Sequence, residues 1–233
     1  MASPSSPKIR FDAEAIRYDA AYDARGAPGQ ALRDRLETVL ELAGDSGGEA
    51  LDAGMGPGRL LAALERRGWH VSGVDVSEEM LALARRRLPH AAERLVRAPI
   101  ELLPFPDESF DLVVATGVLE YADDLDAALA EIARTVRPGG RAIVSLPNWW
   151  SVSALCRRYV LYPAARLLPR RGRDAPPPPR RLVRAEEFEA LLTRADLAPT
   201  AVRLTSFRPR AFRRLGLRPL AAQIVFATER QPA

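Results

Sequence analysis

The chain has 233 residues, enough for one sizeable domain and too few for two comfortable ones. Hydrophobic residues make up 47% of it, which is typical of a globular core and excludes a wholly disordered chain. The net charge of +4 is divided unevenly, because residues 1–150 carry 17 basic and 24 acidic side chains whereas residues 151–233 carry 17 and 6. We therefore expect a single domain over residues 1–233, with an arginine-rich part toward its carboxyl end.

Three features predict a cytoplasmic protein. The segment Met1–Pro7 is rich in Ser and Pro and lacks the apolar run of a secretory signal. The apolar stretch Tyr159–Leu168 is interrupted by Pro163 and is too short to span a bilayer. Cys156 is the only cysteine, so no internal disulfide can form. The sequence predicts no metal site and leaves the oligomeric state open.

Helical patterns come first and an alternation of strands and helices follows. Helices are predicted at Asp12–Ala24 and Pro28–Ala43, and they form an amino-terminal helical cap over residues 1–45. Strands are then predicted at Glu49–Ala53, His70–Asp75, Arg94–Arg97, Phe110–Ala115 and Arg141–Leu146. Between them lie a helix over Pro57–Arg67 that starts with Pro, a helix capped by Ser77, and a helix over Leu125–Val136 that ends at Pro138-Gly139-Gly140. This alternation predicts an α/β fold with a mostly parallel sheet and helices on both faces.

Residues 148–182 interrupt the regular pattern with a basic segment. Nine arginines lie between Arg157 and Arg184, interleaved with aromatic and apolar side chains and a single acid, Asp174. A helix at Ala185–Ala195 and strands at Ala201–Ser206 and Ala222–Thr228 follow, so we interpret 148–182 as a lid-like insertion within the domain. It is either a solvated lid or a surface for an anionic substrate or an anionic membrane surface. Nucleic acid is disfavoured because no recognised binding module is present.

The segment Asp52-Ala53-Gly54-Met55-Gly56-Pro57-Gly58 joins a predicted strand to a predicted helix through a glycine turn. Glycines let the backbone approach a ligand closely, and a helix amino terminus offers free N–H groups. The spacing differs from the dinucleotide fingerprint, because Arg59 stands where that pattern has its third Gly or Ala. Asp52 precedes the first glycine by two residues, where it can face a cationic amino group.

Asp75 ends the next predicted strand and supplies the second half of the expected site. A carboxylate in this position can accept hydrogen bonds from both hydroxyls of a ribose. The alternative is that Asp75 merely caps the turn between strand and helix. The spacing of one βαβ unit between the glycine turn and the acid favours a ligand site.

Four segments in order resemble the motifs of class I S-adenosylmethionine-dependent methyltransferases, chiefly the branch typified by ubiquinone and menaquinone biosynthesis. They are Leu51-Asp52-Ala53-Gly54-Met55-Gly56-Pro57-Gly58, Gly73-Val74-Asp75-Val76-Ser77, Leu103-Pro104-Phe105-Pro106-Asp107 through Asp111, and Leu119-Glu120 with the later Arg137-Pro138-Gly139-Gly140. The resemblance implies a Rossmann-like, seven-stranded sheet of order 3-2-1-4-5-7-6 with strand seven antiparallel. It also implies that S-adenosylmethionine is the cofactor.

The resemblance assigns cofactor roles to particular residues. Gly54, Gly56 and Gly58 would line the aminocarboxypropyl end, Asp75 would bind the ribose, and Val76 would pack on the adenine. Pro99 stands where the family often has an Asp, so adenine contacts are expected from the backbone near Ala98 and Ile100, or from Glu101. Asp52 and Thr116 complete the expected cofactor set.

Methyl transfer from a sulfonium releases a neutral leaving group, so the enzyme mainly has to align the reacting atoms and exclude water. A base is needed only if the nucleophile must lose a proton. Tyr121 stands where the family often has His, and His70 and His90 are expected to be structural or to face solvent. The candidate catalytic residues are Tyr18, Tyr22, Glu120 and Tyr121. Tyr18-Asp19 resembles the family's Tyr-Asp pair that folds over the cofactor, and simple helix packing is an alternative role for Tyr22.

The sequence therefore predicts a methyltransferase acting on a small-molecule acceptor, hydrophobic or anionic, such as a natural product or other secondary metabolite. Two alternatives stay open: methylation of a membrane-associated quinone or lipid, and a non-catalytic S-adenosylmethionine-binding protein.

Overall fold

A computed structural model describes residues 7–45, 47–149, 181–205 and 223–231. Its strands form one seven-stranded sheet of order β3-β2-β1-β4-β5-β7-β6. The strands are β1 Glu49–Ala53, β2 His70–Asp75, β3 Leu95–Arg97, β4 Phe110–Ala115, β5 Val136–Pro147, β6 Leu197–Thr205 and β7 Gln223–Arg230. Strand β7 is antiparallel to both neighbours and the other strand pairs are parallel. The predicted fold and strand order are confirmed.

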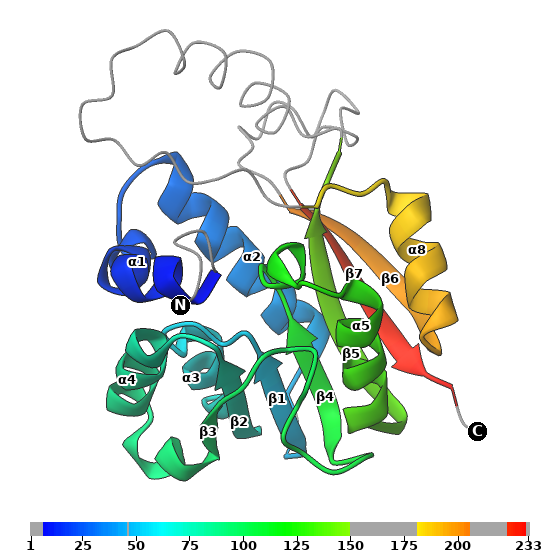
Figure 1. Cartoon of the computed structure of the whole chain (residues 1–233), viewed down its shortest axis with the longest axis horizontal. Coiled ribbons are helices and arrows are strands. Elements are labelled where there is room, and N and C mark those ends of the chain that lie inside the picture. The colour runs from blue at the N-terminus through cyan, green and yellow to red at the C-terminus, as the bar shows by residue number, and fades with distance from the viewer. Residues whose placement is uncertain (1–6, 46, 150–180, 206–222, 232–233) are drawn as a thin grey trace, which may run out of the picture.

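Helices cover both faces of this sheet (Figure 1). They are α1 Pro7–Ala21, α2 Ala27–Ala43, α3 Arg59–Glu65, α4 Glu78–Arg87, α5 Leu125–Thr135 and α8 Ala185–Arg194, with short 3-10 helices η1 Pro89–Arg94 and η2 Leu119–Tyr121. Because side chains alternate along a strand, Val113 packs with α5 and α8 on one face, whereas Leu112 and Val114 pack with α2, α3 and α4 on the other. The two apolar clusters fix the sheet between its helices.

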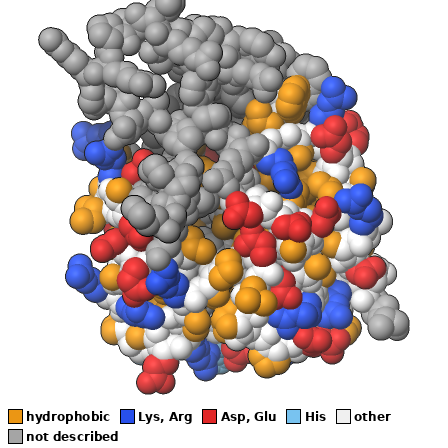
Figure 2. All heavy atoms as spheres, in the orientation of Figure 1, with side chains coloured by type: hydrophobic (Ala, Val, Ile, Leu, Met, Phe, Trp, Pro, Cys, Tyr) orange, Lys and Arg blue, Asp and Glu red, His pale blue; other side chains and the backbone are white. Residues whose placement is uncertain are grey.

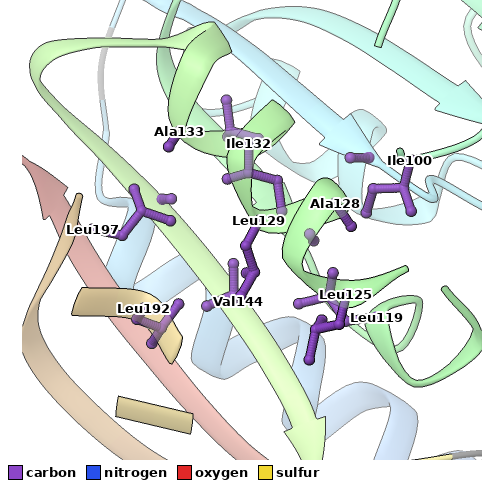
Figure 3. Close-up of a cluster of buried hydrophobic side chains, with 14 of the residues drawn as sticks. Ile100, Leu119, Leu125, Ala128, Leu129, Ile132, Ala133, Val144, Leu192 and Leu197 are labelled. Atoms are coloured by element: carbon purple, nitrogen blue, oxygen red, sulfur yellow. The ribbon is translucent and has the colours of Figure 1, made fainter. Parts of the chain in front are cut away.

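Helix α5 shows how the sequence pattern produces this packing. Asp124 caps it by accepting a hydrogen bond from the Ala127 N–H at 3.0 Å. Its apolar stripe faces the sheet, and Figure 3 shows Leu129 and Ile132 of this stripe close to Val144 of β5. This packing sets the position of β4 and β5, whose carboxyl ends lead to the candidate site.

Two predicted helix boundaries are wrong. Helix α3 begins at Arg59 instead of Pro57, because Gly58 adopts a left-handed conformation with φ 74° and so ends the loop before the helix. Helix α5 ends at Thr135, and Pro138-Gly139-Gly140 lies within β5, which begins at Val136. The reason is the sheet, since Val136 pairs with Phe110 of β4 across a local register shift.

The remaining differences are shifts of element ends. Helix α1 runs from Pro7 to Ala21, earlier than predicted, and β3 starts at Leu95 because Arg94 belongs to η1. Strand β6 starts at Leu197 and β7 reaches Arg230, because these two residues pair with each other. Sequence propensity alone does not include such pairing partners.

Most of the expected lid-like insertion lies outside the described residues, at 150–180. Its described ends meet, because Asn148 bridges Val183 and the Trp149 N–H donates to the Val183 carbonyl at 3.0 Å. On the described part of the face in Figure 2, acidic and basic side chains are interspersed. Within the described ranges, no helix combines the length and apolar character needed to cross a membrane.

Candidate cofactor site

A pocket lies at the carboxyl ends of β1, β2 and β4. Parallel pairing of Ala53 with Val74 and of Asp52 with Val114 brings the loops after these strands to one edge of the sheet. Helices α1 and α2 supply further wall residues, and Figure 1 shows α1 beyond this edge. The empty volume of the pocket is about 1250 Å³, including open solvent at its mouth.

Most of the residues predicted for the cofactor line this one pocket: Asp52, Gly54, Gly56, Asp75, Val76, Ala98, Ile100 and Thr116. Pro99 and Glu101 line it too, and Glu101 accepts a hydrogen bond from the Asp123 N–H at 2.7 Å. The structure therefore gathers side chains that lie up to 64 positions apart in the chain.

The glycine turn is tied to β2 by its backbone. The N–H groups of Gly54 and Met55 both donate to the Val74 carbonyl, at 2.8 and 2.9 Å. A Cβ on Gly54 would lie 2.5 Å from Cγ2 of Val118, and its φ of 84° is unfavourable for other residues. A Cβ on Gly56 would project into the pocket, toward Met80 and Tyr18 at 3.9 Å. Larger residues at either position would therefore distort or fill the site.

Gly58 has a different place from the one predicted. It does not line the pocket; it is the N-cap of α3, where an added Cβ would lie 3.0 Å from the Ala84 Cβ of α4. Its small size lets α3 and α4 approach each other, and its left-handed backbone ends the turn. Sequence spacing alone does not separate this packing role from a ligand contact.

Asp75 presents its carboxylate at the pocket wall. Its Oδ2 accepts from the Gly56 N–H at 2.8 Å and its Oδ1 accepts from the Ser77 N–H at 2.9 Å. Burial raises the pKa of Asp75, and the backbone N–H groups of Ser77 and Gly56 oppose this rise. Each oxygen keeps a second lone pair, so the carboxylate is fixed in place and still able to accept a diol.

Opposite charges of Asp52 and Arg35 lie at another part of the wall. Burial raises the pKa of Asp52 to about 7; the charge of Asp75 adds to this rise and Arg35 opposes it. Arg35 is the one cation among the described residues that line the pocket, which also has the carboxylates of Asp52, Asp75, Glu101 and Asp123. This arrangement suits the ammonium and carboxylate groups of an amino acid.

Arg35 was not predicted from the sequence. Its Nη2 donates to the Tyr18 hydroxyl at 2.9 Å, and its guanidinium occupies the space in which a side chain at Gly117 would lie, with Nη1 2.2 Å from the position of an added Cβ. In the sequence Arg35 is one of two arginines of an amphipathic helix, and its immediate neighbours do not distinguish it. The apolar periodicity of α2 was the available signal, because it places Arg35 beside the partly buried Leu36 and the buried Val39.

Three of the four predicted catalytic residues, Tyr18, Tyr22 and Tyr121, line the pocket. Tyr18 and Tyr22 meet edge to face with ring centroids 5.8 Å apart, and Tyr121 meets Phe11 of α1 in the same way at 5.1 Å. Burial, reinforced by Tyr18, raises the pKa of Tyr22, so that phenol stays protonated near neutral pH. These aromatic rings make one side of the pocket apolar.

Glu120, the fourth predicted catalytic residue, does not line the pocket. It is 5% exposed, and its Oε2 is the one buried side-chain oxygen or nitrogen without a hydrogen-bond partner among the described residues. Burial raises its pKa to about 7, and Arg35 opposes this rise. The side chain of Glu120, in the short η2 turn, is buried, whereas its neighbours Val118 and Tyr121 line the pocket.

Neither histidine is near the site. His70 begins β2 and is exposed, and His90 contacts Glu65 on the surface.

The residues present fit S-adenosylmethionine. Asp75 is placed for a ribose diol, Asp52 and Arg35 for an amino acid end, and Val76, Met80 and Ala98 offer an apolar surface for a base. The glycine turn leaves the space that a Cβ would fill. A dinucleotide fits poorly, because its diphosphate would meet four carboxylates and one cation in the described pocket.

Comparison with known proteins agrees with this geometry. Residues 51–144 match a family model described as a methyltransferase domain. The malonyl-acyl-carrier-protein O-methyltransferase of Serratia marcescens is 37% identical over 130 residues, 55% of this chain and 49% of that protein. The demethylmenaquinone methyltransferase of Tropheryma whipplei (strain Twist) is 33% identical over 157 residues, 65% of each chain. The chain thus spans less than two thirds of the length of either relative.

Solved structures share the fold over nearly the whole chain. The cyclase SpnF superposes with a TM-score of 0.71 at 18% identity, covering 97% of this chain and 96% of its own. A SAM-dependent methyltransferase from Thermotoga maritima superposes with a TM-score of 0.66 at 22% identity, covering 95% and 98%. Residues 51–144 thus form a methyltransferase domain, and the four sequence motifs and the strand order agree with the class I, S-adenosylmethionine-dependent type.

Proposed function

We propose that this protein is an active S-adenosylmethionine-dependent methyltransferase that modifies a small, largely apolar molecule such as a natural product or other secondary metabolite. The observation that carries the proposal is the fixed carboxylate of Asp75, which shares one pocket with the glycine turn and with an aromatic wall. That wall, made of Phe11, Tyr22 and Tyr121, suits an acceptor that buries apolar surface.

The bound cofactor supplies an electrophilic methyl group on a sulfonium. The chain's own contribution is binding and orientation. Asp75 would hold the ribose, and Arg35 with Asp52 would hold the amino acid end. Tyr18, Tyr22 and Tyr121 would shield the reacting centre from water and orient the acceptor through their rings and hydroxyls. Alignment of this kind supplies up to about 7–11 kcal/mol of barrier reduction in favourable cases.

A second candidate acceptor is a membrane-associated quinone. The similarity to a demethylmenaquinone methyltransferase supports it, as does the arginine-rich segment of residues 157–184. An anionic acceptor fits the described pocket less well. Arg35, the one cation among the described lining residues, would already bind the cofactor's carboxylate.

The first prediction concerns cofactor selection. In calorimetry, S-adenosylmethionine and S-adenosylhomocysteine should both bind, and NAD should bind at least tenfold more weakly because its diphosphate meets four carboxylates. Tighter binding of NAD would contradict the assignment. Turnover of methyl-labelled cofactor with a metabolite extract then separates an enzyme from a non-catalytic binding protein, which would bind the cofactor without transferring label.

The second prediction concerns Arg35. A carboxylate bonded to a buried guanidinium makes a charge-assisted contact of about 1.5–3 kcal/mol, so Arg35→Met should weaken S-adenosylhomocysteine binding about tenfold or more. The decarboxylated analogue should bind wild type and variant alike, which controls for damage to the fold. If the variant keeps its affinity for S-adenosylhomocysteine, Arg35 serves another anion, and the KM of a carboxylate-bearing acceptor should rise instead.

A further inference from the structure

Helix α1 covers one side of the pocket and is attached to the rest of the protein mainly by polar contacts. Of its described side chains, Phe11 to Ala21, Ala15 alone is fully buried, and Ile16 is 75% exposed. Helix α5, by contrast, buries six residues against the sheet. In this described part of α1, Ala15 and the ring contact of Phe11 with Tyr121 provide apolar packing, and polar contacts provide the rest.

Charged side chains make the attachment. Asp19 of α1 accepts from Arg59 Nε at 2.7 Å and from Arg87 Nη2 at 3.0 Å to each oxygen. Arg59 also bonds Asp23, just beyond α1, at 2.9 and 2.5 Å. We call these four residues, Asp19, Asp23, Arg59 and Arg87, the arginine latch. A separate contact, from Ser77 Oγ to Asp12 Oδ1 at 2.6 Å, holds the earlier part of the helix.

The arginine latch connects α1 to the elements that form the cofactor site. Arg59 is the first residue of α3, directly after the glycine turn, and Arg87 is the last residue of α4. Arg87 also donates to the carbonyl of Pro57 within that turn. On α1, Asp19 follows Tyr18, whose ring lines the pocket. A change in the latch therefore acts on both sides of the site.

Three of the four latch side chains are half-hidden from water, and the fourth, Asp23, is 70% exposed. The side chains of Arg59, Asp19 and Arg87 are 22%, 19% and 26% exposed. Ion pairs of this kind are stronger than fully exposed ones, yet solvent ions still reach and screen them.

We propose that Asp19 is a positioning residue: bound by Arg59 and Arg87, it holds α1 with Tyr18 over the pocket and so sets the rate at which the bound nucleoside leaves. The proposal rests on the proposed function only for the identity of that ligand. Opening of α1 exposes the pocket, and the ion pairs determine how often it opens. The dissociation rate should therefore depend on ionic strength.

The test uses Asp19→Asn, which keeps the shape of the side chain and removes its charge. In stopped-flow displacement, the koff of S-adenosylhomocysteine from the full-length variant should rise about tenfold or more at 20 mM salt. In the wild type koff should increase between 20 and 500 mM salt, and in Asp19→Asn this salt dependence should largely disappear. In Arg87→Gln, koff should rise above the wild-type value. In Arg87→Lys, which keeps the charge, koff should stay close to the wild-type value.

Hydrogen exchange gives a readout that needs no ligand. Backbone amides of α1 should exchange faster in Asp19→Asn than in the wild type, while those of α5 should be unchanged. The matched control is Arg85→Gln, which removes an exposed ion pair of α4 with Glu78 and a hydrogen bond to the Leu95 carbonyl, both away from the latch. Unchanged exchange in α1, or an equal effect of Arg85→Gln, overturns the proposal. If S-adenosylhomocysteine does not bind at all, the proposed function fails, and the exchange data still decide whether the latch holds α1.

Discussion

Asp75→Ala should weaken the binding of S-adenosylhomocysteine by more than tenfold. A carboxylate that accepts two ribose hydroxyls makes charge-assisted hydrogen bonds of about 1.5–3 kcal/mol each, and about 1.4 kcal/mol corresponds to one decade in Kd. The carboxylate is already fixed by the N–H groups of Gly56 and Ser77, so no ordering cost opposes this gain. Titration calorimetry of wild type and variant measures the difference directly.

The same two backbone contacts create an ambiguity, because Asp75→Ala also releases the glycine turn. A ligand lacking both ribose hydroxyls resolves it. If Asp75 binds the ribose, the dideoxy analogue should bind the wild type and Asp75→Ala with nearly equal Kd. The coupling energy between the Asp75 carboxylate and the two ribose hydroxyls should then account for most of the tenfold loss. Equal losses for both ligands would mean that Asp75 acts only by shaping the turn.

The parts of the site that depend on a few consecutive residues could be predicted from the sequence. The glycine turn, Asp75 and the Ser77 cap each follow from local chain geometry, and Ser77 indeed accepts from the Met80 N–H at 3.2 Å. The mostly parallel sheet followed from the alternation of strands and helices, and the strand order from the family resemblance. Val113 and its neighbours in β4 are apolar on both faces, as a central parallel strand requires.

The parts that depend on distant partners could not be predicted. Arg35 becomes a pocket residue only because α2 packs across the sheet edge and Gly117 leaves room for its guanidinium. Gly58 has the same local pattern as Gly54, and only the approach of Ala84 gives it a packing role. Strand β5 absorbs Pro138-Gly139-Gly140, because pairing with β4 outweighs the local turn signal.

The substitution Glu120→Gln should stabilise the protein against unfolding. The gain over the wild type should be larger at pH 8 than at pH 5. In the unfolded chain this carboxyl has a pKa near its ordinary value of 4.5, whereas burial raises the pKa to about 7 in the folded protein. Between these values the unfolded state loses its proton first, so wild-type stability falls as pH rises, and above about pH 7 the penalty is complete. Removing the charge should therefore change the difference in unfolding free energy by roughly 2–3 kcal/mol between pH 5 and pH 8.

Urea unfolding of both proteins at the two pH values measures this difference, with the exposed Glu93→Gln of η1 as the control that should show no such change. A pH-independent difference for Glu120→Gln would mean that the folded protein does not carry a buried carboxylate at this position at pH 8. A gain in stability would have a specific meaning, because a group that costs folding energy and leaves its Oε2 without a hydrogen-bond partner is retained for another reason. The charge of Arg35, which lines the pocket, acts on the Glu120 carboxylate. We therefore expect the reason to lie in ligand binding. Glu120→Gln should bind S-adenosylhomocysteine with an altered pH dependence, whereas Glu93→Gln should leave that pH dependence unchanged.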